Sequence, residues 1–347
     1  MPNEITIKRP DDWHLHLRDG PILGEVAAYT AAHFARAIVM PNLVPPVTDA
    51  LSASSYRSRI LAASGDSGFE PLMTAYLTDQ SDPDELVNAY RDGIISAVKM
   101  YPAGATTNAD RGVTDVKNVY PILEKMQTTN MPLLVHGEVV GDEYDIFDRE
   151  KIFLDTILST LHETFPALKI VLEHVTTKQG IEFVRGGGDN VAATITPHHL
   201  MINRSTMFKG GIRPHLYCLP IAKRQEHQQT LREAATSGSP KFFLGTDSAP
   251  HPEEDKQSAC GCAGIFNAGT ALACYAQVFD EENKLENLER FTSLNGPAFY
   301  GLPVNQDTVT LRRFDTPLDQ PDPVGAGKIH QFLPDSPVYW QVVAGAK

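Results

Sequence analysis

The sequence lacks long apolar runs, an excess of positive charge and any dense set of cysteines. No stretch approaches the roughly 18 consecutive apolar residues that a membrane-spanning helix requires. The segment Met1–Trp13 is polar and has no apolar signal-peptide core, so we expect neither a membrane span nor a secretory signal. The formal net charge of −13 disfavours non-specific nucleic-acid binding, which needs a positive surface. We therefore expect no nucleic-acid partner and no membrane partner.

The four cysteines are sparse and irregularly spaced, at Cys218, Cys260, Cys262 and Cys274. This spacing does not resemble a disulfide framework and favours reduced thiols in the cytoplasm. The Cys260-Gly261-Cys262 segment could bind a soft metal, but no second pair of Cys or His lies at zinc-finger spacing. The reduced-thiol interpretation is therefore preferred.

Eight short apolar runs rich in Val, Ile and Leu alternate with longer segments of helical character. The expected strands are Trp13–Leu17, Ala37–Met40, Leu72–Leu77, Ile94–Met100, Pro132–His136, Lys169–His174, Val191–Thr196 and Lys241–Gly245. Apolar strands separated by helices are typical of a parallel sheet that is covered on both faces. We therefore predict an α/β fold, a (β/α)₈ TIM barrel, for which 347 residues is a suitable length.

Several helices are marked by caps and by apolar spacing. Ser81-Asp82-Pro83, followed by two acidic residues, is typical of a helix start. Apolar positions three and four apart predict helices over Thr114–Thr128 and Lys151–Phe165, and another is expected at Gly269–Phe279.

The region from Asp307 onward carries proline-rich turns and two short strand-like pieces, Thr308–Leu311 and Val338–Val343. We expect it to be an appendage of the barrel rather than a separate unit. The predicted organisation is one domain over residues 1–347 with a C-terminal appendage at about 307–347.

Potential metal ligands lie at the ends of the predicted strands. His14 and His16 are two residues apart on the first strand, so both imidazoles face the same way and can reach one ion or one ion of a pair. The other candidates are Lys99, His136, His174 and Asp247. Because the active site of such a barrel forms at the carboxyl ends of its strands, we expect these side chains to converge on one rim.

Each candidate alone also fits a structural role. A histidine at a strand end is often a hydrogen-bonded part of the scaffold. Asp247 could cap a helix, and Lys99 could be a partly buried cation paired with a carboxylate. Four histidines and an aspartate at rim positions together favour a metal centre.

Lys99 needs a separate argument, because an ammonium group has three donors and no acceptor and cannot bind a metal. Between Val98 and Met100 its pKa is expected to fall through desolvation, which frees the amine to react. Carbamylation by CO₂ would convert it into an anionic oxygen ligand able to bridge two metals.

These residues, in this order, resemble the binuclear amidohydrolase superfamily. Within it the chain is similar to the dihydroorotase family in its compact monofunctional bacterial form. The motifs that carry this resemblance are Asp11-Asp12-Trp13-His14-Leu15-His16-Leu17-Arg18, Val39-Met40-Pro41-Asn42, Val98-Lys99-Met100-Tyr101-Pro102 and Gly245-Thr246-Asp247-Ser248-Ala249-Pro250-His251. The resemblance extends to about Leu302, and no ligand position departs from the family's pattern.

The resemblance implies two Zn²⁺ ions per subunit, bridged by an N6-carboxylated Lys99 and a hydroxide. It places His14, His16, Lys99 and Asp247 on one ion and Lys99, His136 and His174 on the other. The implied reaction is the reversible cyclisation of N-carbamoyl-L-aspartate to L-dihydroorotate plus water, the third step of de novo pyrimidine (UMP) biosynthesis. In the hydrolytic direction the hydroxide attacks the ring amide carbonyl, with Asp247 as general acid/base.

An anionic substrate needs cationic and hydrogen-bonding groups. Arg18 offers a bidentate fork for a carboxylate. The resemblance adds Asn42 and His251 as carboxylate partners and backbone groups near Leu219 and Ala263 as partners of the ring. It also places His16 and His136 against the substrate.

The segment Pro102–Asn108 carries small residues, a glycine and two hydroxyls, those of Thr106 and Thr107. We expect it to be a lid that closes over the substrate and excludes water. The alternative is an ordinary flexible loop.

Other functions remain open from the sequence. A hydantoinase or allantoinase would share the metal ligands, although Arg18 and Asn42, with His251, favour a ring that bears a carboxylate. A catalytically silent scaffold of the same fold would be expected to have lost ligands, and a mononuclear deaminase would leave Lys99 without a role. The resemblance also implies a homodimer.

Overall fold

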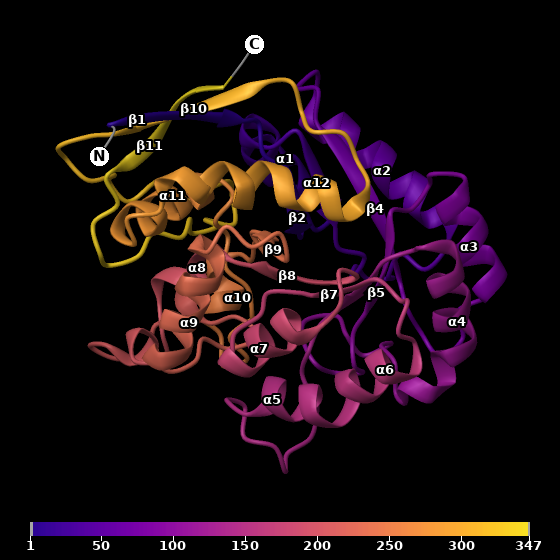
Figure 1. Ribbon diagram of the computed structural model, residues 1–347. Coiled ribbons are helices and arrows are strands. Elements are labelled where there is room, and N and C mark those ends of the chain that lie inside the picture. The colour runs from indigo at the N-terminus through magenta and orange to yellow at the C-terminus, as the bar shows by residue number, and fades with distance from the viewer. Residues whose placement is uncertain (1–2, 346–347) are drawn as a thin grey trace.

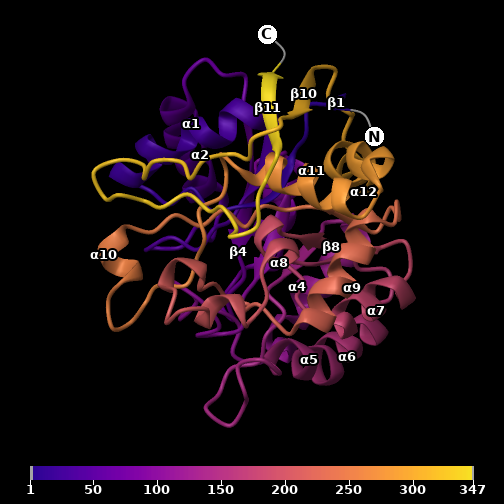
Figure 2. The same ribbon diagram turned by 90° about the vertical axis from the view of Figure 1, so that its left-hand side faces the viewer.

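The structure is a computed structural model that describes residues 3–345; the ends of the predicted domain, residues 1–2 and 346–347, lie outside it. Eight parallel strands form a barrel in sequential order, with helices around it (Figures 1 and 2). The strands are β2 Asp12–Leu15, β3 Arg36–Val39, β4 Glu70–Tyr76, β5 Ala97–Met100, β6 Leu133–Val135, β7 Ile170–Leu172, β8 Val191–Ile195 and β9 Phe242–Leu244. All eight lie within one or two residues of a predicted run or inside it, and the predicted barrel is confirmed.

The barrel closes just beyond the last strand. A parallel bridge joins Leu15 to Ser248. The amide of Asp247 donates to the carbonyl of His14 at 2.8 Å, and the amide of His16 donates to Ser248 at 3.0 Å. The first and last strands therefore meet at the rim where the predicted ligands lie.

Helices cover the outside of the barrel. They are α1 Pro21–His33, α2 Ala50–Ser64, α3 Pro83–Arg91, α4 Tyr120–Thr129, α5 Arg149–Phe153, α6 Ser159–Thr164, α7 Lys178–Gly186, α8 Pro197–Met201, α9 Gln225–Thr236, α10 Glu253–Lys256, α11 Ala271–Glu281 and α12 Asn295–Tyr300. The side chain of Asp82 caps α3 as expected. The helix predicted from Lys151 to Phe165 is α5 and α6, joined by a π-helical turn at Leu154–Leu158.

A second, antiparallel sheet contains both ends of the described chain (Figure 1). It consists of β1 Glu4–Lys8, β10 Thr308–Arg313 and β11 Trp340–Gly345, with β10 in the middle. The two later strands were predicted, but β1 was not, because its Glu-Ile-Thr-Ile-Lys sequence lies in a segment that is polar on average. The appendage is thus built from the N-terminal strand as well as the C-terminal region.

The interior of the barrel is filled at its amino-terminal end. The residues of this lower layer are Trp13, Ile38, Leu72, Ala97, Leu134, Val171, Ala192 and Phe243, and Met40, two positions after Ile38, packs on them from the layer above. Trp13 stacks on Tyr300 of α12, with ring centroids 4.4 Å apart, and so seals the bottom. The carboxyl ends of the strands are therefore the only end at which a polar site can be built on this core.

Candidate active site

Polar side chains form the next layer of the barrel interior. Side chains two positions apart on a strand share a face, so the residue two positions after a lower-layer residue projects inward one layer higher. The residues in this position include Thr74, Lys99, His136, Glu173, Thr194 and Gly245. Gly245 is required here because a Cβ atom would lie 2.7 Å from Thr194 Cβ and 3.0 Å from His14 Cβ.

A bulge in β2 brings His14 into the same layer. Asp12 pairs with Ala37 while Leu15 pairs with Val39, so β2 has one more residue than β3 over this stretch. Trp13 therefore packs inside the lower layer, and His14, the next residue, also faces the interior.

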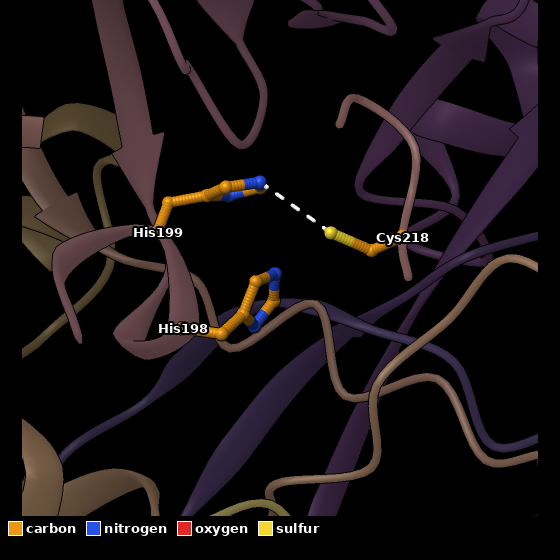
Figure 3. A group of neighbouring side chains, drawn as sticks. All are labelled: His198, His199 and Cys218. Carbon is orange, nitrogen blue, oxygen red and sulfur yellow. Dashed lines mark hydrogen bonds between the residues drawn. The ribbon is translucent and has the colours of Figure 1, made fainter. Parts of the chain in front are cut away.

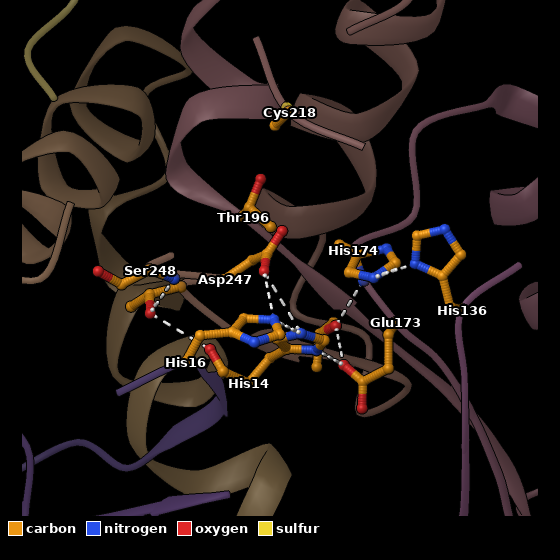
Figure 4. Close-up of polar contacts among 12 residues, drawn as sticks. His14, His16, His136, Glu173, His174, Thr196, Cys218, Asp247 and Ser248 are labelled. Atoms are coloured by element: carbon orange, nitrogen blue, oxygen red, sulfur yellow. Dashed lines mark hydrogen bonds and ion pairs between the residues drawn. The ribbon is translucent and has the colours of Figure 1, made fainter. Parts of the chain in front are cut away.

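His14, His16 and Asp247 converge at the rim (Figure 4). Asp247 Oδ1 lies 3.4 Å from His14 Nε2 and 3.2 Å from His16 Nε2, and the two Nε2 atoms are 3.3 Å apart. Burial lowers the pKa of both histidines, so they are neutral, and burial raises the pKa of Asp247, against the opposing effect of His14.

Glu173 orients His14 from the opposite side. His14 Nδ1 donates to Glu173 Oε2 at 2.7 Å, and the hydroxyl of Thr194 donates to the same oxygen at 2.6 Å. His14 Nε2 then carries a lone pair that faces the Asp247 carboxylate, an arrangement that repels unless a metal ion or a proton lies among these atoms. Glu173 was not predicted from the sequence, although its position two residues after Val171, in an apolar strand, is a signal that could have identified it.

His136 and His174 form the neighbouring part of the site (Figure 4). Their Nδ1 and Nε2 atoms, respectively, lie 3.2 Å apart, and His136 Nε2 lies 3.0 Å from Glu138 Oε2. His174 has a positive φ of 39° and a buried Nδ1 that has no hydrogen-bond partner within residues 3–345. Burial lowers its pKa well below the usual value, so the ring is neutral and one of its two nitrogens keeps a lone pair for a metal.

Lys99 is fully buried in the same layer as His14 and His136, and its Nζ atom has no hydrogen-bond partner in the described part of the chain. Burial lowers its pKa to about 8, although Glu173 and Asp247 act in the opposite direction. A buried ammonium group is unfavourable when none of its three N–H donors has an acceptor. A neutral amine that reacts further fits this environment better, as expected from the sequence.

The donor set fits a metal centre. Ligand atoms of His14, His174 and Asp247 all lie within 4.8 Å of one another, and all three residues are buried. His16, His136 and Lys99 surround this group, so the structure brings all six predicted ligands together.

All of the predicted substrate-binding residues except His251 line a cavity beside these ligands. Its walls include His16, Arg18, Asn42, Thr106, Thr107, His136, Leu219 and Ala263. Arg18 donates through its guanidinium to the carbonyl of Pro250 at 3.2 Å and lies 2.8 Å from His251 Nε2. Burial and the neighbouring Arg18 lower the pKa of His251 to about 2, so Arg18 is the positive charge of this pair.

The segment predicted to be a lid lies over the cavity. Asn42 Nδ2 donates to the carbonyl of Thr107 at 2.9 Å, and the Thr107 hydroxyl donates to the carbonyl of Ala263 at 3.3 Å. Thr107 thus connects the segment with residues on two other sides of the cavity.

A second buried group consists of His198, His199 and Cys218 (Figure 3). His199 Nδ1 lies 2.8 Å from the Thr196 hydroxyl, and His199 Nε2 lies 2.9 Å from the carbonyl of Pro220. Since a carbonyl only accepts, Nε2 carries the proton and is not free to bind a metal. We interpret this group as support for the segment that carries Leu219.

The chain matches the model of the Amidohydrolase family over residues 10–309. It is 57% identical over 345 residues, 99% of either chain, to a dihydroorotase from Jannaschia sp. (strain CCS1). The chain belongs to the dihydroorotase family of amidohydrolases.

Solved structures agree with this family. The crystal structure of dihydroorotase from Saccharomyces cerevisiae in complex with 5-fluoroorotic acid is 33% identical, has a TM-score of 0.88 and covers 99% of both chains. L-Hydantoinase (dihydropyrimidinase) from Arthrobacter aurescens has a TM-score of 0.81 at 16% identity, covering 99% of this chain and 84% of that one. The likeness to the hydantoinase is evidence for the fold alone, whereas the dihydroorotase family membership rests on sequence as well. No helix of this dihydroorotase-family chain, over residues 3–345, is long and apolar enough to cross a membrane.

Proposed function

We propose that this chain catalyses the reversible cyclisation of N-carbamoyl-L-aspartate to L-dihydroorotate plus water, the third step of de novo pyrimidine biosynthesis. The observation that carries the proposal is the sequence relationship to dihydroorotases along nearly the whole chain. A relative bound to 5-fluoroorotic acid, a pyrimidine with a carboxylate, supports the substrate class. A cavity that combines Arg18 with a set of metal ligands supports it further.

The residues that would hold two Zn²⁺ ions are His14, His16, Lys99, His136, His174 and Asp247, with Lys99 as an N6-carboxylysine bridge. The buried and unpartnered Nζ of Lys99, judged within residues 3–345, supports this modification. The ammonium first loses one proton; the neutral amine nitrogen then bonds to CO₂ and releases a second proton, which leaves an anionic carbamate. The ions, when bound, polarise the substrate carbonyl and favour ionisation of the attacking water.

Side chains of this protein would perform the remaining steps. The guanidinium of Arg18, with Asn42 and His251, would bind the substrate carboxylate. In the hydrolytic direction water adds to the ring amide carbonyl and the carbon–nitrogen bond breaks. Asp247 would accept the proton of the attacking water and return it to the leaving nitrogen, a role that suits its raised pKa.

Cytoplasmic location, a homodimer and a single domain over residues 1–347 belong to the same proposal. The four cysteines are unpaired, which supports a reducing compartment. The hydrophobic core that surrounds the barrel also contains Ile7, Val309 and Trp340 of the second sheet, which supports one domain.

The test is the ultraviolet loss of L-dihydroorotate with purified protein, with and without a chelator, beside hydantoin and allantoin. We expect turnover of dihydroorotate alone, abolished by the chelator. Turnover of hydantoin instead would retain the metal centre but refute the role of Arg18 and Asn42. No turnover of any substrate in the presence of zinc would favour a silent scaffold.

A further inference from the structure

Lys256, at the end of α10, is buried outside the group of predicted ligands and is 3% exposed. Its ammonium donates to three main-chain carbonyls, those of Tyr217 at 2.8 Å, Cys262 at 2.7 Å and Gly264 at 2.7 Å. Three donors thus meet three acceptors. No carboxylate among residues 3–345 forms an ion pair with it, so its charge is not neutralised by a neighbour.

The three carbonyls belong to two segments that face the cavity. Leu219 lies two residues after Tyr217, and Ala263 lies between Cys262 and Gly264; both Leu219 and Ala263 line the cavity. The amide of Gly264 also donates to the carbonyl of Tyr217 at 3.1 Å, which joins the two segments directly. Lys256 is therefore the side chain that holds both of these cavity walls in place.

Gly264 shows how closely these segments pack. It has a φ of 152°, and a Cβ atom there would lie 2.8 Å from the carbonyl oxygen of Ala249 and 2.8 Å from His251 Cδ2. A small shift of this segment would therefore displace His251 as well as Ala263.

The C-terminal region holds α10 from the outside. His330 Nε2 lies 2.6 Å from Glu253 Oε2, and the amide of Glu253 donates to the carbonyl of Gly327 at 2.9 Å. The helix that carries Lys256 is thus fixed by the appendage, while Gln257–Cys260 beyond it are exposed. Because α10 is held in this way, the side chain of Lys256 starts from a fixed backbone position and can hold the cavity walls in place.

We propose that Lys256 is a positioning residue for substrate binding, which fixes the main chain at Leu219 and Ala263 and adds positive charge behind the part of the cavity that takes the anionic substrate. This inference rests on the proposed function. Because the partners of Lys256 are neutral carbonyls, its field adds to that of Arg18 instead of being cancelled. A planar arginine fork would not match three acceptors arranged around a single nitrogen.

The charge of Lys256 is also sensitive to pH. Burial is the main cause that lowers its pKa to about 8; the Cys218 and Cys262 thiols oppose this shift, and the nearby Arg18 contributes to it. Burial raises the pKa of both thiols, and it lowers the pKa values of the facing histidines, His198, His215 and His251. Lys256 is therefore the member of this set that changes charge near pH 8, where a deprotonated amine would turn a lone pair toward a carbonyl oxygen.

The experiment compares Lys256→Met with the wild-type full-length protein, using L-dihydroorotate and recording kcat, KM and Tm from about pH 6.5 to 9. Lys241→Met is the matched control. Lys241 also donates to two main-chain carbonyls, those of Gly187 and Gly188, both at 2.6 Å, but it lies at the amino end of β9, away from the cavity.

We expect Lys256→Met to raise KM about tenfold or more, the equivalent of one lost hydrogen bond, with kcat changed by less than about threefold. The wild-type KM should rise above pH 8, whereas the KM of Lys256→Met should be high and independent of pH in this range. Lys241→Met should lower Tm and leave KM and its pH dependence unchanged.

Two outcomes would overturn the proposal. An unchanged KM with a lower kcat, which is the result of a smaller folded fraction, would give Lys256 a purely structural role. A Lys256→Met KM that retains the wild-type rise above pH 8 would assign that rise to another group. If Lys256→Met does not fold, Lys256→Gln, which keeps two donors without the charge, decides by the same criteria. An inactive wild-type protein would instead refute the proposed function.

Discussion

His14 Nδ1 lies 2.7 Å from Glu173 Oε2, so a carboxylate on β7's carboxyl end determines which nitrogen of a β2 histidine faces Asp247. The two residues are 159 positions apart in the sequence, and both are almost fully buried. A carboxylate that orients a metal-binding histidine commonly affects metal affinity and activity nearly as much as the metal ligands do.

Glu173→Gln is expected to lower metal affinity or kcat/KM by about 10- to 100-fold, because a neutral amide holds the imidazole less firmly in this tautomer. The measurement is metal content after dialysis, together with kcat/KM in added zinc. Glu163→Gln, on the exposed side of α6, is the control and should change neither. Full metal occupancy with normal activity in Glu173→Gln would contradict the role of Glu173.

Arg18→Gln is expected to raise KM by about 10- to 100-fold, the cost of losing a charged hydrogen-bonding partner of a carboxylate. Arg18→Lys should recover only part of this loss, because lysine lacks the bidentate fork. Arg312→Gln removes an exposed arginine that pairs with Glu4 at 2.7 Å in the second sheet, and it should leave KM unchanged. The measurement is the KM for L-dihydroorotate in steady-state kinetics. An unaltered KM in Arg18→Gln would mean that the substrate carboxylate does not bind to Arg18.

The barrel and the set of ligands could be predicted from the sequence because both depend on local periodicities. Eight apolar runs define the strands, and the rule that barrel sites form at strand ends brings distant residues such as His14 and His174 together. Four of the six predicted ligands lie within or directly beside the strands that the structure shows. The order of apolar runs and polar residues along the chain is therefore sufficient to predict the strands and the ligands at their ends.

Features that depend on local departures from these periodicities could not be predicted. The bulge in β2 places Trp13 and His14 on the same side, contrary to strict alternation. His174 and Asp247 reach the site through positive φ angles of 39° and 45°. Lys256 was missed for a different reason, because its partners are main-chain carbonyls that no residue type reveals.

Thr107→Val tests the lid. It removes the hydroxyl that donates to the Ala263 carbonyl at 3.3 Å while keeping the shape of the side chain. The expected result is a loss of about 5- to 10-fold in kcat/KM, the effect of one hydrogen bond, with a smaller loss in Thr106→Ala. Thr128→Val removes an exposed hydroxyl that donates to the Lys125 carbonyl on α4, so its kinetics should match the wild type. Unchanged kcat/KM in both Thr106→Ala and Thr107→Val would favour an ordinary loop.

Gly245→Ala should lower both stability and activity, because the new methyl group would lie 3.0 Å from His14 Cβ and 2.7 Å from Thr194 Cβ. Overpacking of this kind costs about 1–3 kcal/mol in the free energy of unfolding. The matched control is Gly24→Ala on α1, where a Cβ atom meets nothing within 4 Å and helix propensity should add about 0.5–1 kcal/mol of stability. Denaturant unfolding and kcat/KM separate the two glycines. If Gly245→Ala unfolds like the wild type and retains full activity, the His14 ring does not depend on the space that this glycine leaves.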